Sequence, residues 1–246
     1  MRDTTPPDDN AVERNGSGNV GSDEQIAIET QNLTKQFSDV LAVDGLDLRI
    51  SYGTVYGFVG PNGAGKTTLF NLLCGVLSPS EGTITYKGND ITSLSVVDTA
   101  RQGLVRSYQT ANLFQELTVS ENVRTAAQQN YSKYNFWKSI EDIPGLSQDV
   151  SEILQFLRLA DVGNKEVSEL SHGERRTLEI AVALGSEPDM ILMDEPTSGI
   201  SPEETEQITN TIEKIAADIP VVVVEHKMSV VRRVADRIVV LHNGQK

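Results

Sequence analysis

The most informative feature of this sequence is a glycine-rich run whose pattern is typical of a phosphate-binding loop. Residues 60–67 read Gly-Pro-Asn-Gly-Ala-Gly-Lys-Thr and fit the phosphate-binding pattern G-x-x-x-x-G-K-[ST]. A strand-like run, 54–59, precedes them and a helix-like run, 67–73, follows them. Glycine turns and a helix start both direct backbone N–H groups at phosphate oxygens. The alternative is a glycine-rich turn without a ligand, which the strand–loop–helix context disfavours.

The side chains of this loop predict a nucleoside triphosphate and magnesium as ligands. Lys66 would reach the β- and γ-phosphates, and the Thr67 hydroxyl would bind Mg²⁺. The predicted nucleotide-binding residues of the loop are Gly60, Pro61, Asn62, Gly63, Ala64, Gly65, Lys66, Thr67 and Thr68.

Two acidic residues end an apolar strand later in the chain. The run 190–195 reads Met-Ile-Leu-Met-Asp-Glu, so a buried strand would bring Asp194 to the magnesium beside the glycine loop. Glu195 would then polarise the water that attacks the γ-phosphate. A strand followed by a solvated acidic turn is the alternative.

A second candidate anion site lies at the start of a helix-like run. Leu170-Ser171-His172-Gly173-Glu174 precedes the helical pattern 177–184, and a hydroxyl and free N–H groups at a helix start suit an anion. Ser171 and Glu174 also fit the capping box S-x-x-E. The two interpretations are compatible, because one helix start can cap itself and bind phosphate.

The order of elements predicts an α/β fold with a mostly parallel core sheet, an antiparallel β subdomain and a helical subdomain. Alternating runs at 26–29, 46–50 and 83–86 favour half-buried antiparallel strands. From residue 190 onward, short apolar runs alternate with helical patterns, which is typical of a parallel sheet covered by helices. The segment of about 112–170 is mainly helical in pattern.

Composition narrows the class of protein. The formal net charge of −14 argues against a nucleic-acid-coating surface. It suits either a salt-rich, halophilic cytoplasm or an ordinary acidic protein.

Residues 1–25 contain few apolar side chains, so we expect a disordered acidic tail and a folded domain over 26–246. No apolar run approaches the roughly 18 residues of a membrane span, and the single cysteine, Cys74, is expected in the core.

Together these motifs resemble the ATP-binding subunit of an ABC transporter. The resemblance covers about 26–246, and the motifs come in the family's order: P-loop, Q-loop glutamine at Gln109, signature at 170–174, Walker B acids, D-loop at 198–201 and switch histidine at His226. The fold implied is the P-loop NTPase ABC cassette, and the activity implied is ATP hydrolysis with Mg²⁺.

The resemblance also implies roles for residues outside the loop. Phe37 falls where an aromatic ring stacks on adenine, with a core phenylalanine as the alternative. Gln109 would contact Mg²⁺ or the attacking water, unless it is a solvated strand-end residue. His226 would hold the γ-phosphate, and Glu195, His226 and Gln109 form the predicted catalytic set. Thr67, Asp194 and Gln109 form the predicted metal set.

In this family two nucleotide-binding subunits meet head to tail, as a homodimer or heterodimer. The signature residues Ser171, His172, Gly173 and Glu174 would therefore complete the partner's ATP site. Closure on ATP drives separate transmembrane permease subunits, supplied with solute by an extracytoplasmic binding protein. The resemblance thus places the chain on the cytoplasmic face of the membrane, with its permease contact around 111–115 and the helical segment after Val119. Phe136 and Trp137 belong either to that contact or to packing within the helical lobe.

Departures from the commonest family pattern indicate a branch. They include His172 and Glu174 in the signature, a D-loop without its usual aspartate, and Glu225 before the switch histidine. These features are similar to branched-chain amino acid importers, with urea or short-amide importers as the alternative. A soluble ABC protein acting on DNA or ribosomes, or an ATP-binding module without turnover, are further alternatives. The chain stops shortly after a strand-like run, so we expect a shortened C-terminal subdomain.

Overall fold

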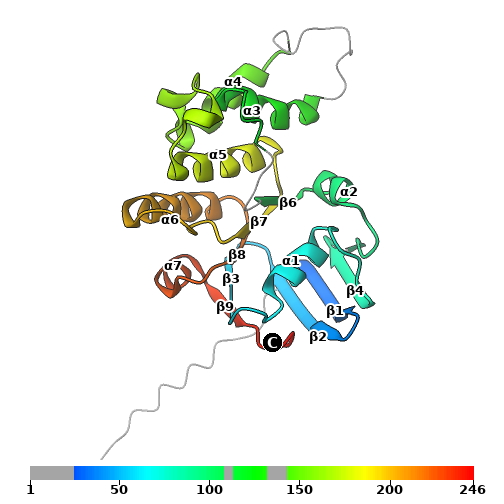
Figure 1. The fold of residues 1–246 in the computed structure, drawn as a ribbon. Helices are drawn as coiled ribbons and strands as arrows, with labels where there is room; N and C mark the ends of the chain where they lie inside the picture. The colour runs from blue at the N-terminus through cyan, green and yellow to red at the C-terminus, as the bar shows by residue number, and fades with distance from the viewer. Residues whose placement is uncertain (1–24, 108–112, 132–142) are drawn as a thin grey trace, which may run out of the picture.

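The computed structural model describes residues 25–107, 113–131 and 143–246. Three predictions lie outside this part of the chain: the tail up to residue 24, the role of Gln109, and the placement of Phe136 and Trp137. Figure 1 shows the described elements, with an antiparallel sheet at one end, helices at the other and a parallel sheet between them.

The antiparallel sheet has the order β2-β1-β4-β5, which confirms the predicted antiparallel layer. Its strands alternate because one face is buried and the other is solvated. In β2, for example, Leu46, Leu48 and Ile50 are buried while the residues between them are exposed. The strands span Ile26–Phe37 (β1), Val40–Ser51 (β2), Glu81–Tyr86 (β4) and Asn89–Asp90 (β5).

The second sheet is parallel, in the order β6-β7-β8-β3-β9. Successive side chains of a strand point to opposite faces, so Val222 and Val224 join the core under the antiparallel sheet. Val221 and Val223 join the core under the helices. The strands span Tyr56–Val59 (β3), Leu104–Ser107 (β6), Met190–Asp194 (β7), Val221–Val224 (β8) and Arg237–Val240 (β9).

Helices cover the parallel sheet and build a separate lobe. Figure 1 shows α3, α4 and α5 together at the end of the molecule away from β1 and β2. The lobe forms around buried residues such as Val123, Leu154 and Leu178. The α-helices span Lys66–Leu73 (α1), Val96–Arg101 (α2), Val119–Ala127 (α3), Leu146–Phe156 (α4), His172–Gly185 (α5), Pro202–Ala216 (α6) and Met228–Val234 (α7).

This architecture confirms the predicted fold class. The strands β7 and β8 lie where the apolar runs predicted them, and Cys74 is buried as expected. The elements β5, α2 and β6 were not predicted because their runs are short and carry charged residues. Within the described residues, no helix combines the length and apolar character that crossing a membrane requires.

Candidate nucleotide site

The glycine loop forms a tight turn between β3 and α1. Gly65 has φ +96°, and a Cβ at this position would lie 2.3 Å from the Ala42 carbonyl oxygen. Both the left-handed backbone and the close approach therefore require glycine here. The C-terminal turn supports the loop from behind, because the Gly244 N–H donates to the Ala64 carbonyl oxygen at 3.2 Å.

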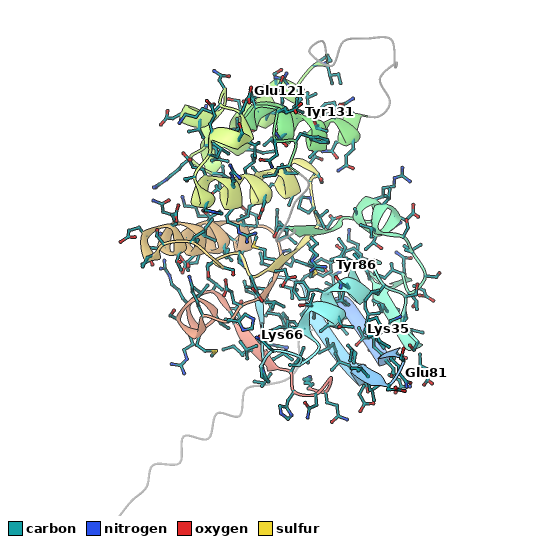
Figure 2. The ribbon with its side chains drawn as sticks, viewed as in Figure 1. Lys35, Lys66, Glu81, Tyr86, Glu121 and Tyr131 are labelled. Atoms are coloured by element: carbon teal, nitrogen blue, oxygen red, sulfur yellow. The ribbon has the colours of Figure 1, made fainter. Side chains whose placement is uncertain are left out.

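Lys66 begins α1 and lies between the parallel and antiparallel sheets (Figure 2). Its Nζ donates to the carbonyl oxygens of Gly60 at 2.7 Å and Pro61 at 3.0 Å. Burial lowers the pKa of Lys66, while the negative charges of Glu195 and Asp194 act in the opposite direction. The lysine and the two acids, more than 120 residues apart in sequence, thus share one electrostatic environment.

A cavity of about 400 Å³ opens over the loop, a size within the usual range of ligand pockets. It joins the loop to the end of β1, to the start of β2 and to the turns after β7 and β8. The lining residues are Phe37, Val40, Leu41, Ala42, Asn62, Gly63, Ala64, Gly65, Lys66, Thr67, Thr68, Glu195 and His226.

The polar end of the cavity carries a carboxylate–imidazole pair. His226 Nε2 lies 2.8 Å from Glu195 Oε1. The two meet because β7 and β8 are parallel neighbours, with Asp194 opposite Val224, so both following turns leave the same edge of the sheet. A carboxylate so placed can accept a proton, and the imidazole can bind an anion or orient the carboxylate.

The apolar end of the cavity carries Phe37. Its side chain is 42 % exposed, so the alternative of a core phenylalanine is wrong. Lys35 Nζ lies 5.2 Å from the ring centroid, and Val40 and Leu41 are exposed beside the ring. An accessible aromatic face on an apolar rim suits a planar heterocycle.

Asp194 is held by a buried arginine that sequence reasoning missed. Arg106, on β6, forms a salt bridge with Asp194, and the two side chains are only 7 % and 5 % exposed. The same guanidinium donates to Asn71 Oδ1 at 2.6 Å. A single arginine within the apolar strand 104–107 was the available signal, because a charge there needs a partner.

The residues proposed to hold Mg²⁺ fit that ion in type. Thr67 and Asp194 offer a hydroxyl and a carboxylate, which are hard oxygen ligands. No group of three or more His, Cys, Asp or Glu side chains in the described residues forms a metal cage. Mg²⁺ needs none when one or two protein ligands are completed by waters and phosphate oxygens.

The signature residues lie apart from this cavity. Ser171 accepts from the Glu174 N–H, and Glu174 accepts from the Ser171 N–H at 2.7 Å, which confirms the capping box. The Gly173 N–H donates to Glu204 Oε1 at 3.0 Å. Ser171, Gly173 and Glu174 line a separate cavity of about 590 Å³ between α5 and α6, whereas His172 is exposed at the first position of α5.

Comparison with known proteins gives a family for this arrangement. Residues 43–198 match the family model described as ABC transporter. The chain is 34 % identical, over 88 % of each protein, to the high-affinity branched-chain amino acid transport ATP-binding protein BraF of Pseudomonas aeruginosa.

Solved structures agree with this match. An ATP-binding cassette of an ABC transporter in its ADP conformation is 32 % identical and has a TM-score of 0.79, with 90 % of this chain and 89 % of that one covered. A dimeric cassette in a post-hydrolysis state, bound to ADP and Pi, is 27 % identical and has a TM-score of 0.75, with 89 % and 95 % covered.

Proposed function

This chain belongs to the ABC transporter family and is an ATPase, and on that premise we propose that it is the energy-coupling subunit of a branched-chain amino acid importer. The observation that carries the proposal is the shared cavity, in which the glycine loop faces the Glu195–His226 pair. A phosphate-binding backbone and a proton acceptor that line the same cavity are what hydrolysis of a γ-phosphate requires.

Each wall of the cavity then has a role. Phe37 stacks on adenine, and the loop N–H groups at the start of α1 surround the phosphates. Lys66 exchanges its two carbonyl partners for phosphate oxygens, which offer its ammonium a stronger, charged acceptor. Glu195 accepts the proton of the attacking water, and His226 orients Glu195 and binds the γ-phosphate.

Two described residues, Thr67 and Asp194, would hold Mg²⁺, with Gln109 as a third ligand by resemblance. When bound, Mg²⁺ neutralises charge on the phosphate oxygens. Arg106 keeps the Asp194 carboxylate oriented at the edge of the sheet through their buried salt bridge.

A second nucleotide-binding subunit completes the site. Ser171 and Gly173 lie outside the cavity that holds Lys66, so they serve ATP bound by a partner facing head to tail. The similar cassette that is dimeric in a post-hydrolysis state supports the pairing of two such subunits. ATP closes the pair of subunits, and hydrolysis reopens it. This cycle drives separate permease subunits, which the pair contacts at the inner face of the membrane.

The transported solute is inferred from relatives. The high-affinity branched-chain amino acid transport protein of Pseudomonas aeruginosa is similar over most of both chains, which favours that solute over urea or short amides. The permease contact includes Phe114, which is exposed beside the helical lobe.

Turnover by purified variants tests the catalytic part of the proposal. Glu195→Gln should bind ATP with unchanged affinity and lose turnover, because the amide cannot accept the proton. Lys66→Ala should weaken ATP binding itself. Glu206→Gln removes an exposed carboxylate that does not line this cavity and serves as the matched control. Normal turnover of Glu195→Gln would refute the role of Glu195, and unchanged affinity of Lys66→Ala would refute the role of the loop.

A further inference from the structure

A buried carboxylate joins the two turns that carry Glu195 and His226. Glu225 is only 2 % exposed. Its Oε1 accepts from the N–H of Thr197 at 2.8 Å and from the Thr197 hydroxyl at 2.5 Å. Its Oε2 accepts from the N–H groups of His226 at 2.9 Å and Lys227 at 3.3 Å. One oxygen thus holds the turn after β7, and the other holds the turn after β8.

A lysine strengthens the same junction. Lys227 Nζ donates to the carbonyl oxygen of Thr197 at 2.9 Å and to the Thr205 hydroxyl on α6 at 2.9 Å. Thr197 is fully buried, and its N–H, hydroxyl and carbonyl oxygen are each bonded to Glu225 or Lys227. The turn after β7 therefore has little freedom to move relative to the turn after β8.

The backbone of Glu195 needs such support. Glu195 has φ +48°, a left-handed conformation that costs energy for a residue with a Cβ. Such a conformation persists only where the surroundings fix it. The Glu195 N–H donates to the Val224 carbonyl oxygen at 2.8 Å, and its carbonyl oxygen accepts from the Ser198 N–H at 3.0 Å. The bonds from Glu225 to Thr197 fasten the other side of this turn.

We propose that Glu225 is a positioning residue that sets the Glu195–His226 contact by holding Thr197 with one oxygen and the His226 backbone with the other. This inference rests on the proposed function of Glu195 and His226. Glu225 is not a catalytic residue, because it does not line the nucleotide cavity and its four hydrogen bonds go to the two turns. Its carboxylate acts through the distance of 2.8 Å between His226 Nε2 and Glu195 Oε1.

Glu225→Gln is the most direct perturbation. The amide replaces one acceptor oxygen by an NH₂ group that faces N–H or O–H donors, so one arm of the junction must open. A displacement of about 1 Å at a reacting group can lower a rate about 100-fold. We therefore expect kcat to fall roughly 10- to 100-fold, with the affinity for ATP unchanged and Glu206→Gln again at the wild-type kcat.

A double-mutant comparison separates positioning from general support of the fold. If Glu225 acts through the pair, Glu225→Gln should lower kcat much less in a His226→Ala background than in the wild type. If Glu225 only stabilised the fold, Glu225→Gln would lower the melting temperature, and kcat measured at temperatures well below that melting temperature would be unchanged. Equal fractional losses of kcat in both backgrounds would overturn the proposal.

Variants of Thr197 test the junction from its other side, even if Glu225→Gln fails to fold. Thr197→Val removes the hydroxyl bonded to Glu225 and keeps the shape, whereas Thr197→Ser keeps the hydroxyl. We expect Thr197→Val to lower kcat and Thr197→Ser to retain it, and wild-type kcat in Thr197→Val would overturn the proposal. Normal ATP turnover in Glu195→Gln would refute the proposed function. Lost turnover in Glu195→Gln, together with wild-type kcat in Glu225→Gln and Thr197→Val, would refute this inference alone.

Discussion

Replacing Arg106 by methionine should destabilise the fold strongly, because it leaves the buried Asp194 carboxylate without its partner. Arg106 and Asp194 are almost fully buried, and removing one partner of a buried ion pair costs about 3–5 kcal/mol because the other charge is left uncompensated. For a chain of this size that loss lowers the melting temperature by roughly 6–20 °C. The Asn71 Oδ1 also loses its donor at 2.6 Å.

Urea unfolding followed by circular dichroism, without nucleotide, measures this loss of stability. The urea concentration at the unfolding midpoint should fall, while the slope of the unfolding free energy against urea concentration stays constant. Adding Asp194→Asn to Arg106→Met removes the stranded charge and should restore most of the stability. Arg49→Met, at an arginine that is 73 % exposed and paired with Glu29, should change stability by less than about 1 kcal/mol. A loss below about 1 kcal/mol in Arg106→Met would contradict a strong coupling between Arg106 and Asp194 in the buried pair. A further loss on adding Asp194→Asn would refute it equally.

Three further predictions concern the ligand, acid stability and the thiol. Phe37→Ala should weaken ATP binding by about 1–3 kcal/mol and leave tripolyphosphate binding unchanged in calorimetry; equal losses for both ligands would contradict adenine stacking. Backbone N–H groups at the starts of α3 and α6 hold the pKa values of Glu121 and Glu204 below their usual value. The two carboxylates therefore stabilise the fold at a pH above the usual pKa of glutamate, and this stabilisation is lost as the pH falls through the lowered pKa values. The stability difference between wild type and Glu121→Gln should accordingly shrink from neutral to acid pH, and a constant difference would contradict it. Burial raises the pKa of Cys74 to about 12, so a disulfide reagent should label it only on unfolding, and fast labelling of the native protein would contradict its burial.

Local sequence predicted the parts of the site that are contiguous. The glycine loop, the acid-ended strand β7 and the all-valine strand β8 each carry their own pattern, and the structure places all three as predicted. The capping box of Ser171 and Glu174 was predictable for the same reason, because its two partners are three residues apart.

The missed contacts depend on which strands are neighbours. Arg106 meets Asp194 only because β6 lies beside β7, and a pattern of apolar runs does not give the order of a parallel sheet. Glu225 was recognised as unusual in the sequence, but its partner Thr197 is 28 residues away. The contact between Gly173 and Glu204 likewise depends on how α5 packs against α6.

Solute uptake by living cells tests the central claim most directly. Cells carrying the normal gene would be compared with cells carrying Glu195→Gln, using labelled leucine and, as the control solute, labelled urea. If the chain powers a branched-chain amino acid importer, leucine uptake is lost in the variant cells and urea uptake is retained. Intact leucine uptake in the variant cells would contradict it, and loss of urea uptake alone would assign the chain to an importer of urea or short amides.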